Sequence, residues 1–191
     1  MQIELDRKST ALVVIDLQKG IVSMDRQLAP HSAKEVIGNA ARLADAFRRS
    51  GMPVFLVHVM SSGPERLNVI ADDQGWGNVQ MPKDWADFVP ELGPKEGDII
   101  ITKRQWGAFY GTDLELQLRR RGMSTIVLCG VSTNHGVEST ARFAYEYGFN
   151  QVFVEDAMSS MSADMHSAAI GIALKRIGMV RSTDEVLAAL Q

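Results

Sequence analysis

Residues Thr125–Arg142 read TIVLCGVSTNHGVESTAR, and this stretch predicts more about the fold than any other part of the chain. The apolar run Thr125–Cys129 is typical of a buried strand, and a helix-like pattern begins at Val137. Between them lies a turn bounded by Gly130 and Gly136. A strand-to-helix turn of this kind can direct backbone N–H groups at a developing negative charge. We therefore expect a functional site there.

Two earlier apolar runs each end at one ionisable residue. Asp16 closes the run Ala11–Ile15, and Lys103 follows Ile99–Thr102. Each has a structural interpretation: the aspartate could cap a loop, and the lysine could extend its stem along the surface. If the strands are parallel, however, their carboxyl ends share one edge of the sheet, where such folds bind ligands. We then expect the Asp16 carboxylate within about 4 Å of the Lys103 amine, close to the Gly136 backbone.

Strand and helix patterns alternate along the whole chain, which predicts one α/β domain over residues 1–191. The short Val/Ile-rich runs lack polar alternation, as in parallel strands covered on both faces. We expect a three-layer α/β/α fold with a doubly wound, mainly parallel, six-stranded sheet. The predicted strands are Ala11–Ile15, Val54–Val59, Ile99–Thr102, Thr125–Cys129, Gln151–Glu155 and Met179–Arg181, and the predicted helices are Ala33–Arg49, Asp113–Arg121, Val137–Tyr147, Ala163–Arg176 and Asp184–Leu190.

Helix ends carry their own signals. Two pairs have the spacing of an N-terminal capping box, in which a hydroxyl and a glutamate three residues later bond each other's backbone. Four glycines stand where helices are expected to end. The capping pairs are Thr112 with Glu115 and Ser182 with Glu185, and the glycines are Gly51, Gly122, Gly148 and Gly178.

Composition excludes several classes of protein. A net charge of −3 does not indicate the basic surface that binds nucleic acid, and no apolar run is long enough to span a membrane. No secretory leader is evident, and the single cysteine, Cys129, excludes an intramolecular disulfide. We expect a cytoplasmic protein with neither nucleic-acid nor membrane partners.

Residues 61–97 interrupt the alternation of predicted strands and helices. A connection this long is typically a lid, a binding loop or a subunit contact. The alternative is an irregular crossover whose aromatic side chains fill gaps in the fold. The segment holds Pro64, Trp76, Pro82, Trp85, Pro90 and Pro94.

Three segments together resemble the isochorismatase-like hydrolases, also called the cysteine hydrolases. They are LVVIDLQ around Asp16, TKRQWGAFYGTDL around Lys103, and the turn GVSTNHGVESTAR. The resemblance implies an Asp–Lys–Cys triad in which Asp16 and Lys103 supply two members, but Gly136 occupies the cysteine position. It also implies a non-proline cis peptide at Val131–Ser132 and a homodimer or homotetramer. Substrate contacts are expected from Trp106, Phe109, Val131, Ser132 and His135.

Without a thiol at position 136, acyl-enzyme chemistry has no obvious nucleophile. Cys129 lies inside a strand, where thiols are normally inert packing, and neither Ser132 nor Thr133 holds the helix N-terminal position. His135 stands where relatives carry an aliphatic residue, and it either contacts substrate or packs on a neighbouring element. True isochorismatases also carry glycine at this position and hydrolyse a vinyl ether. Protonated Asp16 could supply the proton, with Lys103 holding an anionic substrate or tuning the aspartate.

Several interpretations remain open. The chain is a cysteine-independent hydrolase of a small, anionic molecule, a catalytically silent binding or regulatory protein, or a structural subunit. Isochorismate itself is disfavoured, because Gln105 replaces an arginine of the isochorismatase pattern. We predict no cofactor and no metal, since none of the histidines falls within residues 61–97 and no HExxH motif or Cys pair exists; these histidines are His31, His58, His135 and His166.

Overall fold

The computed structural model describes residues 3–22, 27–60, 67, 69–72 and 81–190. Its centre is a six-stranded, all-parallel sheet with the strand order β3-β2-β1-β4-β5-β6. The order reverses between β1 and β4, which makes the carboxyl ends of these two strands the switch point of a doubly wound sheet. The predicted α/β architecture is confirmed. The strands are β1 Thr10–Ile15, β2 Val54–Val59, β3 Ile99–Lys103, β4 Thr125–Val131, β5 Asn150–Ser159 and β6 Met179–Arg181.

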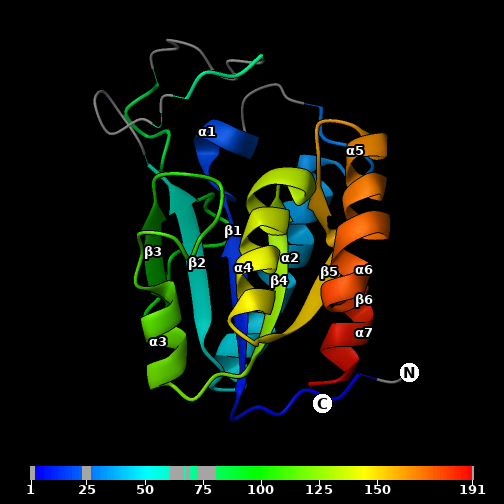
Figure 1. Cartoon of the computed structure of the whole chain (residues 1–191). Coiled ribbons are helices and arrows are strands. Elements are labelled where there is room, and N and C mark those ends of the chain that lie inside the picture. Colours follow the sequence, from blue (N-terminus) through cyan, green and yellow to red (C-terminus); the bar gives the residue numbers. More distant parts are fainter. Residues whose placement is uncertain (1–2, 23–26, 61–66, 68, 73–80, 191) are drawn as a thin grey trace.

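Helices cover both faces of the sheet (Figure 1). In that view α2 and α7 pack behind the sheet, and α4 lies in front of it, next to α5 and α6. The apolar strands are buried as predicted, with every residue of β1 inaccessible or nearly so. The helices are α1 Lys19–Val22, α2 Ala33–Arg49, α3 Leu114–Arg120, α4 Glu138–Glu146, α5 Ala163–Ala168, α6 Lys175–Ile177 and α7 Thr183–Ala188, with π-helical turns at Thr133–Val137 and Ala169–Leu174.

The predicted helix ends are partly wrong. The Ser182–Glu185 capping box is present, but Thr112 and Glu115 form none. Helix α3 begins one residue later than a Thr112 cap requires, and the Thr112 hydroxyl instead donates to the carbonyl of Ala108 at 2.6 Å. Gly178 follows a helix but is extended, not left-handed, and a side chain there would collide with Phe153. The capping box of α2, Ser32 with Glu35, was not predicted.

Two strands extend beyond their predicted carboxyl ends. The fourth runs on to Val131, and the fifth runs on to Ser159. Gly130 lies inside the fourth strand with a φ of +114°, and a Cβ on it would stand 2.0 Å from the carbonyl oxygen of Ile15. Only glycine fits there, so β1 and β4 approach closely where the turn begins.

The described part of residues 61–97 behaves as a packed crossover. Val89 and Leu92 are buried, and Phe88 stacks on His58 at 5.0 Å between ring centroids. Trp76 and Pro64 lie outside the described residues. Among the helices that the structure describes, none has the length and apolar character required to cross a bilayer.

Candidate active site

A buried ion pair joins the carboxyl ends of β1 and β3. Lys103 Nζ lies 2.7 Å from Asp16 Oδ2, and the two side chains are only 1% and 7% exposed. The two strands are separated by β2, roughly 10 Å apart at ordinary strand spacing, so the long lysine side chain crosses above the end of β2. The short distance predicted between these two side chains is confirmed.

Lys103 is held by two further acceptors. Its ammonium group also donates to the carbonyl of Trp106 at 2.8 Å and to that of Gln105 at 3.1 Å. An ammonium has three protons to donate, and these acceptors match that number. The geometry therefore suits a cation that is fixed beside Asp16 better than one that swings out to a ligand.

The hydrogen bonds of Asp16 are less complete than those of Lys103. Its Oδ1 is buried without a hydrogen-bond partner among the described residues, and its backbone φ of +55° is unusual for a residue with a side chain. Burial raises the pKa of Asp16, while Lys103, His58 and the Val59 amide act in the opposite direction. A raised pKa is what a carboxyl group needs in order to act as a proton donor.

The turn after β4 lies directly against this carboxylate. The peptide bond Val131–Ser132 is cis, as the sequence resemblance implied, and Thr133–Val137 form a π-helical turn. A Cβ placed on Gly136 would lie 3.0 Å from Asp16 Oδ2 and 3.4 Å from the Val131 carbonyl oxygen. The position that the sequence resemblance matches to the thiol of the superfamily is therefore within contact distance of Asp16, and here it offers only backbone.

The model of the isochorismatase domain matches residues 10–185 of this sequence. The chain belongs to the isochorismatase family. This family of hydrolases is part of the cysteine hydrolase superfamily, and the match spans all six strands.

Similar proteins align with nearly the whole length of this chain. The uncharacterized isochorismatase family protein YecD of Escherichia coli O157:H7 is 54% identical over 98% of this chain and 100% of its own length. A probable isochorismatase of Pseudomonas chlororaphis is 33% identical over 97% of this chain and 88% of its own. The solved structure of an isochorismatase family protein from Burkholderia thailandensis superposes with a TM-score of 0.91 at 43% identity, covering 98% and 97% of the two chains.

Thr140, which the sequence analysis overlooked, connects the two halves of this isochorismatase-family site. Its hydroxyl donates to the Gly136 carbonyl at 2.7 Å and accepts from the Ala108 amide at 3.1 Å. The loop after Lys103 is thereby fastened to the turn after β4. The signal was the spacing of Gly136 and Thr140, four residues apart, which lets a threonine hydroxyl bond the carbonyl one helical turn back.

The expected substrate-contacting residues separate into two groups. Trp106 is 64% exposed and meets the half-buried ring of His135 edge to face, 4.6 Å between centroids. Burial lowers the pKa of His135, which favours a neutral ring. Phe109, in contrast, packs in the core against Tyr147 and Phe149, so its surroundings indicate a structural role.

The remaining two, Val131 and Ser132, belong to the backbone of the turn. Val131 is buried, and the carbonyl of Ser132 accepts hydrogen bonds from the amides of His135 and Val137. They define the path of the chain at Gly136.

Gln18 is a second residue that the sequence analysis overlooked. Its fully buried amide donates to the carbonyls of Val59 and Trp85 and accepts from the Val59 amide at 2.8 Å. The Trp85 ring in turn covers Gly20, where a Cβ would lie 1.9 Å from it. Two residues after Asp16, Gln18 thus fixes the crossover segment to the end of β1.

Cys129 is unsuited to replace the missing thiol. It is completely buried within β4, and burial together with the charge of Asp156 raises its pKa to about 12. A thiol of that pKa is almost wholly protonated near neutrality.

Proposed function

We propose that this chain is an isochorismatase-family hydrolase that uses Asp16 as a general acid, without a cysteine nucleophile, to cleave a vinyl ether bond in a small anionic molecule. It would belong to a branch of the superfamily in which glycine replaces the thiol. The observation that carries the proposal is a buried, incompletely hydrogen-bonded carboxyl group facing a glycine.

Three features support the carboxyl group as the acid. Burial raises its pKa, which favours the protonated form. Its Oδ1 is buried and has no hydrogen-bond partner among the described residues, so one acceptor position of the carboxyl group is unused. Gly136 places backbone alone against the carboxyl group, because a Cβ there would lie 3.0 Å from Asp16 Oδ2.

The proposed chemistry consumes one water. The Asp16 hydroxyl transfers its proton to the terminal carbon of the vinyl ether, and the C=C bond becomes an oxocarbenium ion. The resulting carboxylate is stabilised by Lys103 at 2.7 Å. Water adds to the cationic carbon and its proton returns to Asp16, and the hemiketal then collapses to a ketone and an alcohol. Such acid assistance contributes about 10²–10⁴-fold in rate.

Lys103 would serve as a regulator of this acid. Desolvation of Asp16 favours its protonated form before proton transfer, whereas the charge of Lys103 favours the carboxylate that forms after it. Because the ammonium is anchored by two carbonyls, substrate recognition would depend more on the turn and on Trp106 and His135. The similarity to a probable isochorismatase supports vinyl ether over amide substrates.

The test is a substrate screen with the wild type, using vinyl ethers, amides and esters that carry a carboxylate. We expect turnover among the vinyl ethers. Asp16→Asn and Asp16→Ala should both lower kcat/KM by about 10²–10⁴-fold, and Lys103→Met should lower kcat more than it raises KM.

Asp98→Asn is the matched control, because Asp98 is also buried and ion-paired, with Arg48 at 2.7 Å, but belongs to no part of this site. It should retain turnover at temperatures where it is folded. If no substrate turns over while a small carboxylate binds, and Lys103→Met abolishes that binding, the chain is a binding protein and the hydrolase proposal fails.

A further inference from the structure

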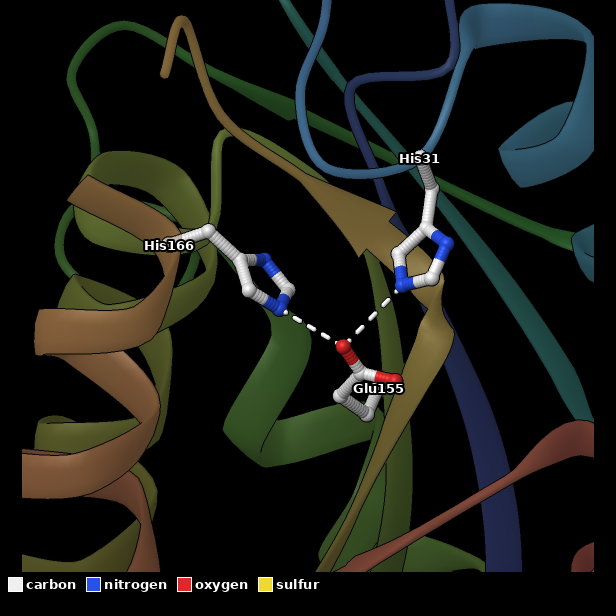
Figure 2. A group of neighbouring side chains, drawn as sticks. All are labelled: His31, Glu155 and His166. Atoms are coloured by element: carbon white, nitrogen blue, oxygen red, sulfur yellow. Dashed lines mark hydrogen bonds and ion pairs between the residues drawn. The ribbon is translucent and has the colours of Figure 1, made fainter. Parts of the chain in front are cut away.

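Two histidines and one glutamate from distant parts of the sequence converge beside the turn after β4 (Figure 2). His31 comes from the loop before α2, Glu155 from β5, and His166 from α5. Both imidazole Nε2 atoms lie 3.0 Å from the same carboxylate oxygen, Glu155 Oε1. The three potential ligand atoms all lie within 4.8 Å of one another.

A distortion of β5 places the glutamate. Residues Phe153–Met158 lie opposite only Leu128–Gly130 of β4, so β5 bulges outward over this stretch. Bulges often redirect a side chain next to a functional site. Asp156 bonds the Thr183 amide and hydroxyl, both at 2.7 Å, whereas Glu155 faces the two histidines (Figure 2).

The two histidines are oriented independently of the glutamate. A pair of backbone hydrogen bonds between Ala29 and Ser160 holds the loop that carries His31. His166 is only 2% exposed, and its Nδ1 lies 2.8 Å from the Thr133 hydroxyl. The two rings stand at 80° to each other, 5.9 Å apart, so they approach the carboxylate from different directions (Figure 2).

We propose that His31, Glu155 and His166 form a binding site for a divalent transition metal ion of the zinc class. Two imidazoles and one carboxylate are a common zinc ligand set. The second nitrogen of a ligating histidine is normally held by a hydrogen bond, as Thr133 holds that of His166. Glu155 is 36% exposed and His31 25%, so a fourth position is open to water.

The three ligand atoms lie close to the separations that an ion requires. Metal–ligand bonds of about 2.0–2.1 Å at tetrahedral angles separate two ligand atoms by about 3.3 Å. Both histidine–glutamate pairs are at 3.0 Å, and the two histidine nitrogens lie within 4.8 Å of each other, so the rings must move together to close on the ion. Each neutral ring keeps one proton, which moves from Nε2 to Nδ1. His166 then donates to the Thr133 hydroxyl, and the ion replaces the two hydrogen bonds to Glu155.

A bound ion would link three chain segments to the catalytic turn. Thr133 begins the π-helical turn that contains Gly136, so a firmer His166–Thr133 contact would also fix this turn. The site is separate from the Asp16–Lys103 pair and is independent of the proposed reaction. Sequence analysis predicted no metal because it searched for short motifs, and these ligands lie 124 and 11 residues apart in the chain.

The experiment uses tag-free protein, treated with a chelator and then titrated with Zn²⁺ alone in competition with a chromophoric chelator. We expect one equivalent of Zn²⁺ per wild-type chain. His31→Ala and Glu155→Gln should weaken binding by at least about 10–100-fold, and Thr133→Val by about tenfold. Co²⁺ should give the intense visible absorption of a low-coordinate, directly ligated ion, which hydrogen-bonded histidines cannot produce.

His135→Ala is the control, since His135 is a half-buried histidine outside the cluster. It should bind Zn²⁺ as the wild type does. His31 is the most suitable ligand to remove, because it lies on a loop and its partly exposed ring can be replaced without opening the core. Its variant should keep its melting temperature but lose the increase that Zn²⁺ gives the wild type. Uptake below one equivalent in the wild type, or equal uptake by His31→Ala and Glu155→Gln, would overturn the proposal.

Discussion

At the scale of single residues, the site differs from that of a thiol hydrolase in where the only thiol of the chain lies. Gly136 touches Asp16 but has no side chain, and Cys129 has a sulfur but lies inside the strand. The two positions are seven residues apart, and the strand holds Cys129 in the hydrophobic core. No rotation of the cysteine side chain can therefore substitute for the missing nucleophile.

We accordingly predict that a disulfide reagent will not modify the native chain. With a pKa of about 12, only about one Cys129 in 10⁴ is ionised at pH 8, and the thiol is inaccessible as well. Reaction should follow global unfolding and reach one equivalent in guanidinium chloride. Cys129→Ala should react at neither stage, and native wild type that reacts as fast as a free thiol would refute the assignment.

At the scale of elements, the site is an assembly of loops that follow parallel strands. The π-helical turn after β4 and the loop after β3 share no sheet hydrogen bonds, because β1 and β2 lie between their strands. Thr140 joins them directly, through Gly136 on one side and Ala108 on the other. The position of Lys103 relative to Gly136 therefore depends on this hydroxyl.

Thr140→Val should destabilise the chain and lower any turnover. Valine has nearly the same shape, but it leaves the buried Ala108 amide without its acceptor, which costs about 1–3 kcal/mol. Denaturant unfolding measures this loss, and Thr140→Ser should restore most of it because the hydroxyl returns. If serine and valine prove equally destabilising, the effect comes from packing and the bridging role is wrong.

Sequence patterns predicted the strands well, because each buried parallel strand is a continuous apolar run. They also placed Asp16 and Lys103 at one sheet edge, since the carboxyl ends of parallel strands align. They failed at Thr112, which has the spacing of a cap, because its hydroxyl donates instead to the carbonyl of Ala108, four residues earlier. They also failed where a position depends on contacts remote in sequence. The His31–Glu155–His166 cluster depends on a bulge that no local pattern encodes.

At the scale of the whole molecule, two buried ion pairs stand at opposite ends of the sheet. Asp98 precedes β3, and both its oxygens accept from Arg48, with a further bond from the Lys95 amide. Asp16 follows β1 and has one oxygen without a partner. A buried carboxylate whose hydrogen bonds are all formed stabilises the fold. One with an unpaired oxygen lowers stability, and such a cost is commonly found at functional sites.

The pH dependence of stability should distinguish the two pairs. Because the pKa of Asp16 is raised in the folded chain, its protonated form favours folding. That contribution is complete below the unfolded pKa of about 3.9 and is lost as pH rises through the folded pKa. Asp16→Asn is neutral at every pH, so it should be more stable than the wild type at pH 7, and the difference should shrink as the pH falls toward 4.

Asp98→Asn should behave in the opposite way at pH 7, losing about 1–3 kcal/mol, because Arg48 loses its charged hydrogen bonds to Asp98 and keeps those to Asp45 and the Leu92 carbonyl. Thermal and denaturant unfolding of the two variants between pH 4 and 8 measures both effects, and about 1 kcal/mol corresponds to about 2–4 °C in Tm for a chain of this size. The asparagine at position 16 can still accept from Lys103, whose other two protons keep their carbonyls. If Asp16→Asn is instead destabilised to the same degree as Asp98→Asn, Asp16 is an ionised structural partner, and the general-acid role is wrong.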